Sequence, residues 1–289
     1  MIFARLRGRL GNQMFQYAVA RAVALRNGVE LVLDARDFID DPKHEYALGD
    51  FPVAARIGRD GELPPDRRAG LRYAWWKFRA IRDGRLCRER GTAFEPRVLA
   101  LGDGAILHGY WQSERYFEDH ADTIRAELTP RTPPSAANAD WLARIRESPA
   151  AVSVHVRRGD YVSQAKNRDL FLALAPSYYA AAAQELCERL GGTPDFYVFS
   201  DAPDWAESEI RLPGPKTVLR HNDGAAAFED LRLMAACRHH IIANSSFSWW
   251  GAWLDPSPDK IVVAPGRWFG ERGGDASDIV PESWILADA

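Results

Sequence analysis

The strongest constraint on the fold is a strand–helix–strand pattern at the start of the chain. Residues 2–6 form a short apolar run, residues 7–11 break it with two glycines, and apolar residues then recur at helical spacing until Asn27 and Gly28. A second apolar run follows at 29–33. A strand, a helix and a strand within about 30 residues make a βαβ unit, whose parallel strands need helices on the sheet faces. The pattern predicts an α/β fold that begins with a Rossmann-like layer.

The same alternation resumes in the second half of the chain. Strands are predicted at 151–156, 196–199, 240–243 and 261–264, and helices at 177–190, 228–237 and 247–254. Between the halves, the Pro-rich segment 130–135 is the clearest linker signal. We therefore expect two Rossmann-like domains at 1–132 and 150–289, with a linker region at 133–149. Ligands of such folds usually bind in the cleft between the domains.

The segment 41–97 predicts little beyond a helix at 71–81, because it is rich in Pro, Arg and Gly. Its aromatic stretch at 73–78 leaves three placements open: against a partner, on a membrane or in the core. Burial in the core is the expected one, since large aromatic side chains are on average highly buried.

Composition excludes several classes of protein. The net charge of -3, from 37 basic and 40 acidic residues, gives no long-range attraction for a polyanion, so no nucleic-acid partner is expected. Cys87, Cys187 and Cys237 are widely separated, which predicts neither a disulfide framework nor a zinc cluster. The N-terminus lacks an apolar signal-peptide core, and no run of about 18 apolar residues occurs. We expect a cytoplasmic protein that reaches any membrane-linked glycan from the cytoplasmic face of the inner membrane; oligomeric state is not predicted.

The first stretch with chemical meaning is the turn at 7–13, between a predicted strand and a predicted helix. Its glycines permit a tight turn, Asn12 is expected to cap the helix, and a helix N-terminus flanked by arginines attracts anions. Gly11, Asn12 and Gln13 are therefore candidates for substrate binding. The stretch is neither a dinucleotide fingerprint nor a Walker loop. A capped turn with two solvated arginines explains it equally well.

The second stretch contains His155, Arg157, Arg158 and Asp160, directly after an apolar strand. This is the carboxyl end of a sheet strand, where open α/β sheets bind ligands. Guanidinium groups bind phosphate oxygens bidentately, and two of them can offset a diphosphate without a metal. The alternative is a structural Arg158–Asp160 ion pair with His155 in the core. We favour phosphate binding for Arg157 and the core for His155, and we keep Arg157, His155 and Asp160 as the catalytic candidates.

The third stretch is a strand that runs into Asn244, Ser245 and Ser246 before an aromatic helix. Hydroxyl groups and amides at a helix N-terminus can hold phosphate oxygens, although an N-cap before a buried helix is the simpler explanation. Asp201 ends another predicted strand, where a carboxylate can accept hydrogen bonds from a purine amino group. The chain contains no Asp-x-Asp triplet, which metal-dependent nucleotide-sugar transferases use to hold a divalent ion, so no metal is expected.

Five segments in sequence order carry a resemblance to a known family. They are GRLGNQMFQYA at 8–18, GYWQSERYF at 109–117, HVRRGDYV at 155–162, YVFSDA at 197–202 and ANSSFSWWGAWL at 243–254. Together they resemble the family 11 glycosyltransferases across nearly the full chain. The resemblance implies a GT-B fold of two Rossmann-like domains, with GDP-fucose bound mainly by the second. It also implies transfer of fucose with inversion, commonly to the 2-hydroxyl of galactose, and independence of metal ions or other cofactors.

The resemblance also implies roles for individual residues. Arg157 would hold the donor phosphates with Arg158 beside it, and Asp201 would recognise guanine. Phe247, with the two serines before it, would line the diphosphate and the base, and Asn12 would face the donor. The chain departs from many relatives at position 202, where alanine stands in place of a second aspartate.

Two questions stay open at the level of sequence. A general base for the acceptor hydroxyl has four candidates, Asp37, Glu114, His155 and Asp160, which the sequence does not rank. The function has two alternatives. One is a transferase of similar architecture with another nucleotide sugar, and the other is a non-catalytic sugar-binding protein that uses some of the ten tryptophans as stacking platforms.

Overall fold

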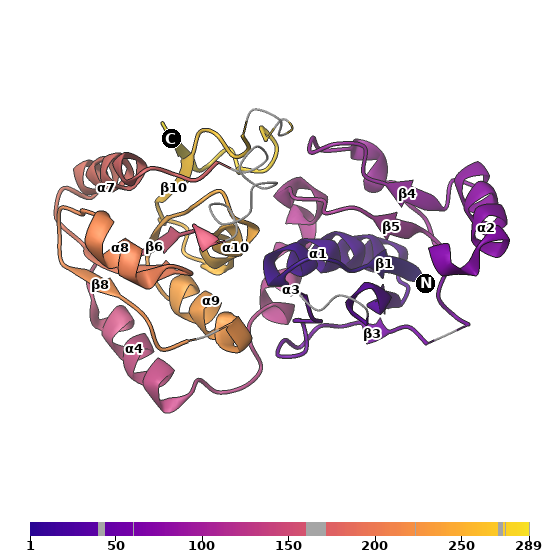
Figure 1. Cartoon of the computed structure of the whole chain (residues 1–289), viewed down its shortest axis with the longest axis horizontal. Coiled ribbons are helices and arrows are strands. Elements are labelled where there is room, and N and C mark those ends of the chain that lie inside the picture. Colours follow the sequence, from indigo (N-terminus) through magenta and orange to yellow (C-terminus); the bar gives the residue numbers. More distant parts are fainter. Residues whose placement is uncertain are drawn as a thin grey trace. The chain divides into compact units, whose positions relative to one another are not determined.

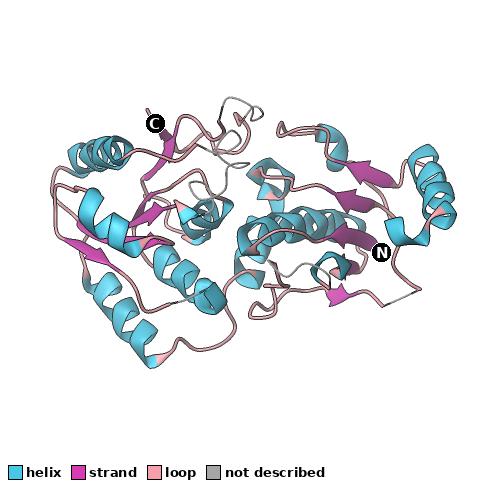
Figure 2. Ribbon diagram, in the orientation of Figure 1, coloured by secondary structure: helices cyan, strands magenta, loops and turns pink. Residues whose placement is uncertain are grey.

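The computed structural model describes residues 1–39, 44–59, 61–159, 172–222, 224–270, 274 and 276–288. The chain divides into two compact units, Met1–Thr129 and Pro130–Ala289. Each unit is an α/β layer built on its own parallel sheet (Figures 1 and 2).

The first unit has a five-stranded sheet in the order β3-β2-β1-β5-β4, with every recorded strand pair parallel. Its strands are β1 Ile2–Arg5, β2 Leu31–Asp34, β3 Arg56–Ile57, β4 Leu86–Arg88 and β5 Ile106–His108, and its α-helices are α1 Leu10–Asn27, α2 Leu71–Arg82 and α3 Ala121–Glu127. Helix α1 ends where Gly28 takes the left-handed conformation, with φ of 62°, which glycine adopts without steric cost. The βαβ unit predicted from the first 33 residues is therefore confirmed.

The second unit has a six-stranded parallel sheet in the order β11-β10-β9-β6-β7-β8. Its strands are β6 Ala151–Val156, β7 Asp195–Ser200, β8 Lys216–Val218, β9 His239–Ile241, β10 Val262–Pro265 and β11 Ile285–Ala287. Its α-helices are α4 Ala136–Glu147, α7 Pro176–Leu190, α8 Pro203–Glu209, α9 Ala227–Ala235 and α10 Ser246–Leu254. All six residues of β6 are buried, as expected for a central strand covered on both faces.

The expected linker at 133–149 is largely a helix, which corrects the prediction. Helix α4 begins after Ser135, whose side-chain oxygen accepts a hydrogen bond from the backbone N–H of Asn138. Leu142 and Ile145, three residues apart on one face of the helix, are buried. The segment therefore packs as part of the second unit, which begins at Pro130.

The core of the second unit contains a buried polar network. The imidazole of His240 is hydrogen-bonded to the Ser153 hydroxyl through Nδ1 at 2.8 Å and to the Asp255 carboxylate through Nε2 at 3.1 Å. All three residues are at most 3% exposed, so the network satisfies polar groups that burial leaves without water. It ties β6 to β9 and to the end of α10.

The aromatic stretch at 73–78 is only partly in the core, so that expectation is half wrong. Tyr73 and Trp76 turn inward from α2, and Trp76 packs against the hydrophobic core of the first unit. In contrast, Trp75 and Phe78 are 62% and 66% exposed. The helical period separates the two pairs onto opposite faces, which a count of aromatic residues does not reveal.

Candidate functional site

Three adjacent strands of the second sheet bring the second and third sequence stretches to one edge. Strand β6 lies between β7 and β9, with His155 opposite Phe199 and Val154 opposite Ile241. The strands are parallel, so the residues that follow each of them emerge at the same carboxyl edge. The predicted position of Arg157 after the carboxyl end of a strand is confirmed, and the third stretch lies at the same edge.

The carboxylate of Asp201, at the end of β7, holds the loop that follows β6. Its Oδ2 lies 3.0 Å from a terminal nitrogen of the Arg157 guanidinium, and its Oδ1 accepts the backbone N–H of Arg158 at 2.9 Å. A Cβ placed on Gly159 would lie 2.5 Å from Oδ2, so only glycine allows this close approach. Both carboxylate oxygens are thus engaged by the loop. This contact differs from the purine contact expected of Asp201.

Arg158 has a different neighbour from Arg157. Its guanidinium carbon lies 3.8 Å from the centroid of the Trp205 ring in α8, a cation–π contact. The two guanidinium groups therefore have different contacts in this structure, and their joint binding of a diphosphate stays a prediction. Residue 160 lies outside the described residues. Neither the alternative Arg158–Asp160 ion pair nor the catalytic role considered for Asp160 can therefore be placed in the structure.

His155 is a buried histidine under the same loop. It is 5% exposed, its ring centroid lies 5.5 Å from that of Phe247, and its Nδ1 has no hydrogen-bond partner among the described residues. Burial lowers the pKa of His155 to about 4, against a smaller opposing effect of Asp201. A neutral imidazole of such low pKa is a weak base at pH 7, so the geometry favours the core reading over the catalytic one.

Of the four substrate-binding candidates near the N-terminus of α10, three lie at the carboxyl edge of the second sheet. Ser245 is the N-cap, and its hydroxyl oxygen accepts the backbone N–H of Phe247 at 3.3 Å. Ser246 and Phe247 are half-buried in the first turn. Asn244 is instead 1% exposed, and its side-chain amide donates to the backbone oxygens of Leu172 and Trp268 at 2.9 and 2.8 Å. The substrate-binding assignment of Asn244 is therefore corrected to that of holding two loops together.

The first sequence stretch forms a tight turn, but Asn12 does not cap the helix. Helix α1 begins at Leu10, and Asn12 already lies in its first turn. The Asn12 Oδ1 accepts a hydrogen bond from Gln112 Nε2 at 2.9 Å, which joins the 8–18 motif to the 109–117 motif. Gly8 has φ of 77°, and a Cβ there would lie 2.8 Å from Asn12 Nδ2, so this turn requires glycine.

Gln13 and Gly11 are buried in α1 rather than exposed at its end. The Gln13 amide nitrogen donates to the backbone oxygens of Gly8 and Glu45 at 2.9 and 2.8 Å, and its oxygen accepts the N–H of Ala47 at 2.9 Å. With 0% exposure, Gln13 supports two loops and does not face a ligand. Its substrate-binding assignment is corrected accordingly.

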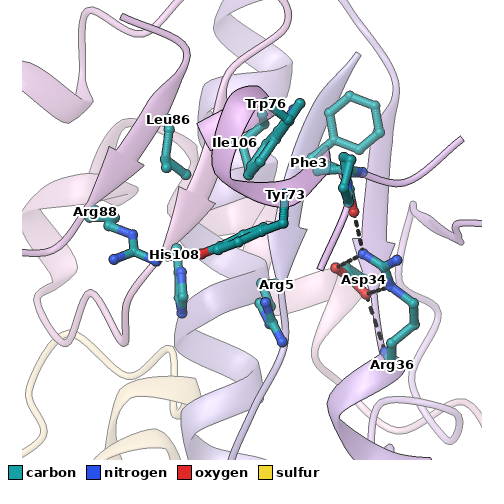
Figure 3. Close-up of a pocket in the computed structure, with 12 residues that line it drawn as sticks. Phe3, Arg5, Asp34, Arg36, Tyr73, Trp76, Leu86, Arg88, Ile106 and His108 are labelled. Carbon is teal, nitrogen blue, oxygen red and sulfur yellow. Dashed lines mark hydrogen bonds and ion pairs between the residues drawn. The ribbon is translucent and has the colours of Figure 1, made fainter. Parts of the chain in front are cut away.

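The first unit has a pocket that the sequence did not predict (Figure 3). It lies at the carboxyl ends of β1, β2, β4 and β5, which contribute Arg5, Asp34, Arg88 and His108. Tyr73 closes it from α2 and places its hydroxyl 3.4 Å from the Arg88 guanidinium. Cations, aromatic rings and hydrogen-bonding groups therefore line one small hollow.

His108 in this pocket and Asp37, which pairs with the pocket residue Arg5, are poor bases. Burial lowers the pKa of His108 to about 4, with help from Arg88 and Arg5. Burial of Asp37 opposes ionisation, but its hydrogen-bonded ion pair with Arg5 brings the pKa of Asp37 below the ordinary value overall. Among the other candidates for a general base, Glu114 lies half-buried in a 3₁₀ turn. His108 was not identified from the sequence as a site residue, because a single histidine at a strand end is too weak a signal.

Glu89 is a second residue that the sequence did not reveal. Its carboxylate accepts the backbone N–H groups of Tyr110 and Trp111, both at 2.7 Å. Trp111 has φ of 58°, rare for a bulky residue, and these hydrogen bonds hold the backbone there. Burial raises the pKa of Glu89. Glu89, directly after β4, thus shapes the 109–117 motif across a sequence separation of 21 residues.

In the described part of the chain, no group of three or more His, Cys, Asp or Glu residues could hold a metal ion.

Comparison with known proteins defines the class of this chain. A primate protein named galactoside alpha-(1,2)-fucosyltransferase 1, from Saimiri sciureus, is 28% identical over 89% of this chain and 66% of its own length. The structure of a mutant of Arabidopsis thaliana FUT1 in complex with GDP shares the fold, with a TM-score of 0.53 and 11% identity over 99% of this chain and 76% of that one. The chain is a glycosyltransferase with two Rossmann-like units of the GT-B type.

The family follows from two further matches. The model described as glycosyl transferase family 11 matches residues 85–286. A protein from Escherichia coli named alpha-1,2-colitosyltransferase is 32% identical over 99% of this chain and 98% of its own length. The chain belongs to glycosyl transferase family 11.

Burial of His155 predicts a pH-dependent stability. Its pKa of about 4 in the folded chain lies below the value of about 6.5 for an unfolded histidine, so the unfolded chain binds more protons between these values. Its stabilising contribution is complete above about pH 6.5 and is lost as the pH falls toward 4. Replacing His155→Leu should reduce the loss of unfolding free energy between pH 7 and pH 5 by about 2 kcal/mol, as measured by urea unfolding.

The matched control is His221→Leu, at an exposed histidine of the same unit. The effect of His155→Leu is measured as its difference from this variant. Equal pH dependence in His155→Leu and the unmodified chain would show that His155 does not titrate between these states.

Proposed function

We propose that this glycosyltransferase moves L-fucose from GDP-fucose to the 2-hydroxyl of a β-galactosyl acceptor, with inversion and without a metal ion. The observation that carries the proposal is the fixed position of Arg157 at the carboxyl edge of the second sheet, where Asp201 holds it. The five family motifs and the names of the relatives support the choice of sugar and linkage.

The proposed chemistry depends on the departing diphosphate. An in-line attack by the acceptor hydroxyl breaks the bond between the sugar and the phosphate, so negative charge develops on GDP as it leaves. The Arg157 side chain is only 16% exposed, and a charge in a partly buried site interacts more strongly than one in water. The first turn of α10, with Ser246 and Phe247, offers the positive end of a helix dipole at the same edge. These positive groups supply the charge that a metal ion provides in other transferases.

We place the acceptor on the first unit. The pocket between α2 and the sheet presents the aromatic side chains of Tyr73 and Trp76 together with arginines, as sites for polar sugars require (Figure 3). Asp37, at the Arg5 ion pair, and Glu114 are the described carboxylates still open as a general base. A dissociative transition state needs little help from a base, so a depressed pKa of Asp37 does not oppose the proposal.

A second donor is favoured by one specific observation. The relative with 32% identity over almost the whole chain is named a colitosyltransferase. Colitose is L-fucose without its 3-hydroxyl group, so the two donors differ by one hydrogen-bonding group. Nucleotide-linked colitose therefore belongs in every donor panel.

The direct test is release of GDP from GDP-fucose in EDTA with a panel of β-galactoside acceptors, followed by NMR assignment of the product. The proposal predicts acceptor-dependent release and a new α-1,2-fucoside. Nucleotide-linked colitose and UDP-sugars are tested in parallel. Faster turnover of the colitosyl donor would show that the transferred sugar is colitose and not fucose. Faster turnover of a UDP-sugar would show that the donor nucleotide is UDP and not GDP. Activity that requires added Mg²⁺ or Mn²⁺ would contradict metal independence. Binding without any turnover would favour a sugar-binding protein.

We propose further that Asp201 positions Arg157 and does not read the guanine base. Arg157→Ala should lower kcat by roughly 10²-fold, the effect of losing one preorganised charge-stabilising contact. Asp201→Asn should lower kcat by about tenfold, and the double variant should be no slower than Arg157→Ala alone, because residues that act through one another are not additive. These values are measured at saturating donor.

If Asp201 instead recognises the guanine base, a different experimental result is expected. Inosine diphosphate lacks the 2-amino group of guanine, so a base-reading carboxylate distinguishes it from GDP. The ratio of the two inhibition constants should stay unchanged in Asp201→Asn, whereas a ratio that falls to one would assign Asp201 to the base. Asp204→Asn is the matched control, since this nearby carboxylate pairs with Arg220 at the surface, and it should leave kcat unchanged.

A further inference from the structure

Helix α2 lies at the periphery of the first unit (Figure 1). Its large apolar side chains form a stripe that is exposed to solvent. Leu71, Trp75 and Phe78 are 90%, 62% and 66% exposed. Their spacing of four and then three residues places them on one face of the helix, and Ile81, 54% exposed, extends the stripe. Single exposed apolar residues are common on protein surfaces, but a contiguous stripe of large ones marks an interaction site.

The opposite face of α2 explains why the stripe is not part of the core. Ala80 is buried, and Trp76 packs against the core cluster of the first unit. Tyr73 reaches into the pocket beneath the helix (Figure 3). The inner face therefore anchors α2, and the outer stripe stays largely exposed to solvent.

The charges around the stripe are mainly basic. Helix α2 carries Arg72, Lys77, Arg79 and Arg82 and no acidic residue. The segment 66–85 has seven basic and two acidic residues, although the whole chain has a net charge of -3. The Arg79 guanidinium lies 4.7 Å from the Trp75 ring, so cations border the apolar stripe directly. A partner for this face must be apolar and anionic.

A second copy of the chain does not meet this requirement. Symmetric pairing of two such faces would bring the two sets of arginines and lysines together, and like charges repel. A phospholipid surface meets it, because aromatic rings settle at headgroup level while Arg and Lys side chains reach the phosphates. A helix of 12 residues is about 18 Å long, too short to span the roughly 30 Å hydrocarbon core of a bilayer. Such a helix can instead lie in the plane of the membrane surface. No helix in the described residues is long and apolar enough to cross a membrane.

We propose that the outer face of α2 docks the protein on an anionic lipid surface. The apolar stripe enters the headgroup region and the basic residues bind the lipid phosphates. The inner face of the same helix lines the pocket of the first unit, so docking brings that pocket close to the membrane surface. The docking surface stands independently of the donor and acceptor proposed above.

The test is sedimentation of the full chain with lipid vesicles. Binding is expected to vesicles that contain phosphatidylglycerol, with little binding to pure phosphatidylcholine and a loss of binding at high salt. The double variant Trp75→Ser with Phe78→Ser should lower the partition coefficient by at least about tenfold. The variant Arg72→Gln with Arg79→Gln should lower it by about tenfold or more, since each cation near an anionic surface contributes roughly fivefold.

Each control variant carries the same number and kind of substitutions at exposed positions outside α2. Ile39→Ser with Leu286→Ser removes two apolar side chains that are 74% and 61% exposed, and Arg131→Gln with Arg211→Gln removes two exposed arginines. Both controls should bind as the unmodified chain does, and thermal unfolding checks that every variant is folded.

Three results would overturn the proposal. The first is unchanged vesicle binding in the Trp75/Phe78 variant. The second is equal binding to neutral and anionic vesicles. The third is absence of vesicle binding together with a dimer, seen in sedimentation velocity, that the serine variant abolishes, because a second copy would then be the partner.

Discussion

The carboxylate of Asp201 is the contact on which the arrangement of the proposed donor site depends. It fixes the Arg157 guanidinium at 3.0 Å and the Arg158 backbone at 2.9 Å, and Gly159 is needed for this close approach. One side chain from the end of β7 thereby holds the loop that follows β6. Preorganised charge is worth more to a departing diphosphate than mobile charge, because it needs no rearrangement during the reaction. We therefore regard the β6 and β7 ends as one functional unit.

In the first unit, polar side chains likewise hold loops in place by binding backbone groups. Glu89 holds the 109–117 motif and Gln13 holds the loop at 44–47. Asn244 does the same in the second unit. Gln13 and Asn244 occur inside motifs that resemble a known family, although in this structure they hold loops and do not present themselves to a ligand.

The sequence predicts the two α/β units because hydrophobic periodicity is a local property, and the edge at Arg157 because parallel strands share one carboxyl end. It fails where the decisive contact is distant. Gln112 and Asn12 meet across 100 residues, and Asp201 reaches Arg158 across 43. The linker prediction at 133–149 fails for a different reason: the prolines before Ser135 obscured a capped amphipathic helix. Motif spacing along the chain identifies candidate residues for a site, but only the tertiary contacts show what each residue does.

The central claim is that the carboxyl edge of the second sheet binds the GDP part of the donor without a metal. Hydrogen exchange of the full chain, followed by mass spectrometry with and without GDP in EDTA, locates the nucleotide directly. The account predicts slower exchange in peptides that cover 155–159, 200–203 and 244–248. Slower exchange confined to the pocket of the first unit, around 34–37 and 106–108, would contradict it, as would slower exchange that appears only when a divalent cation is added.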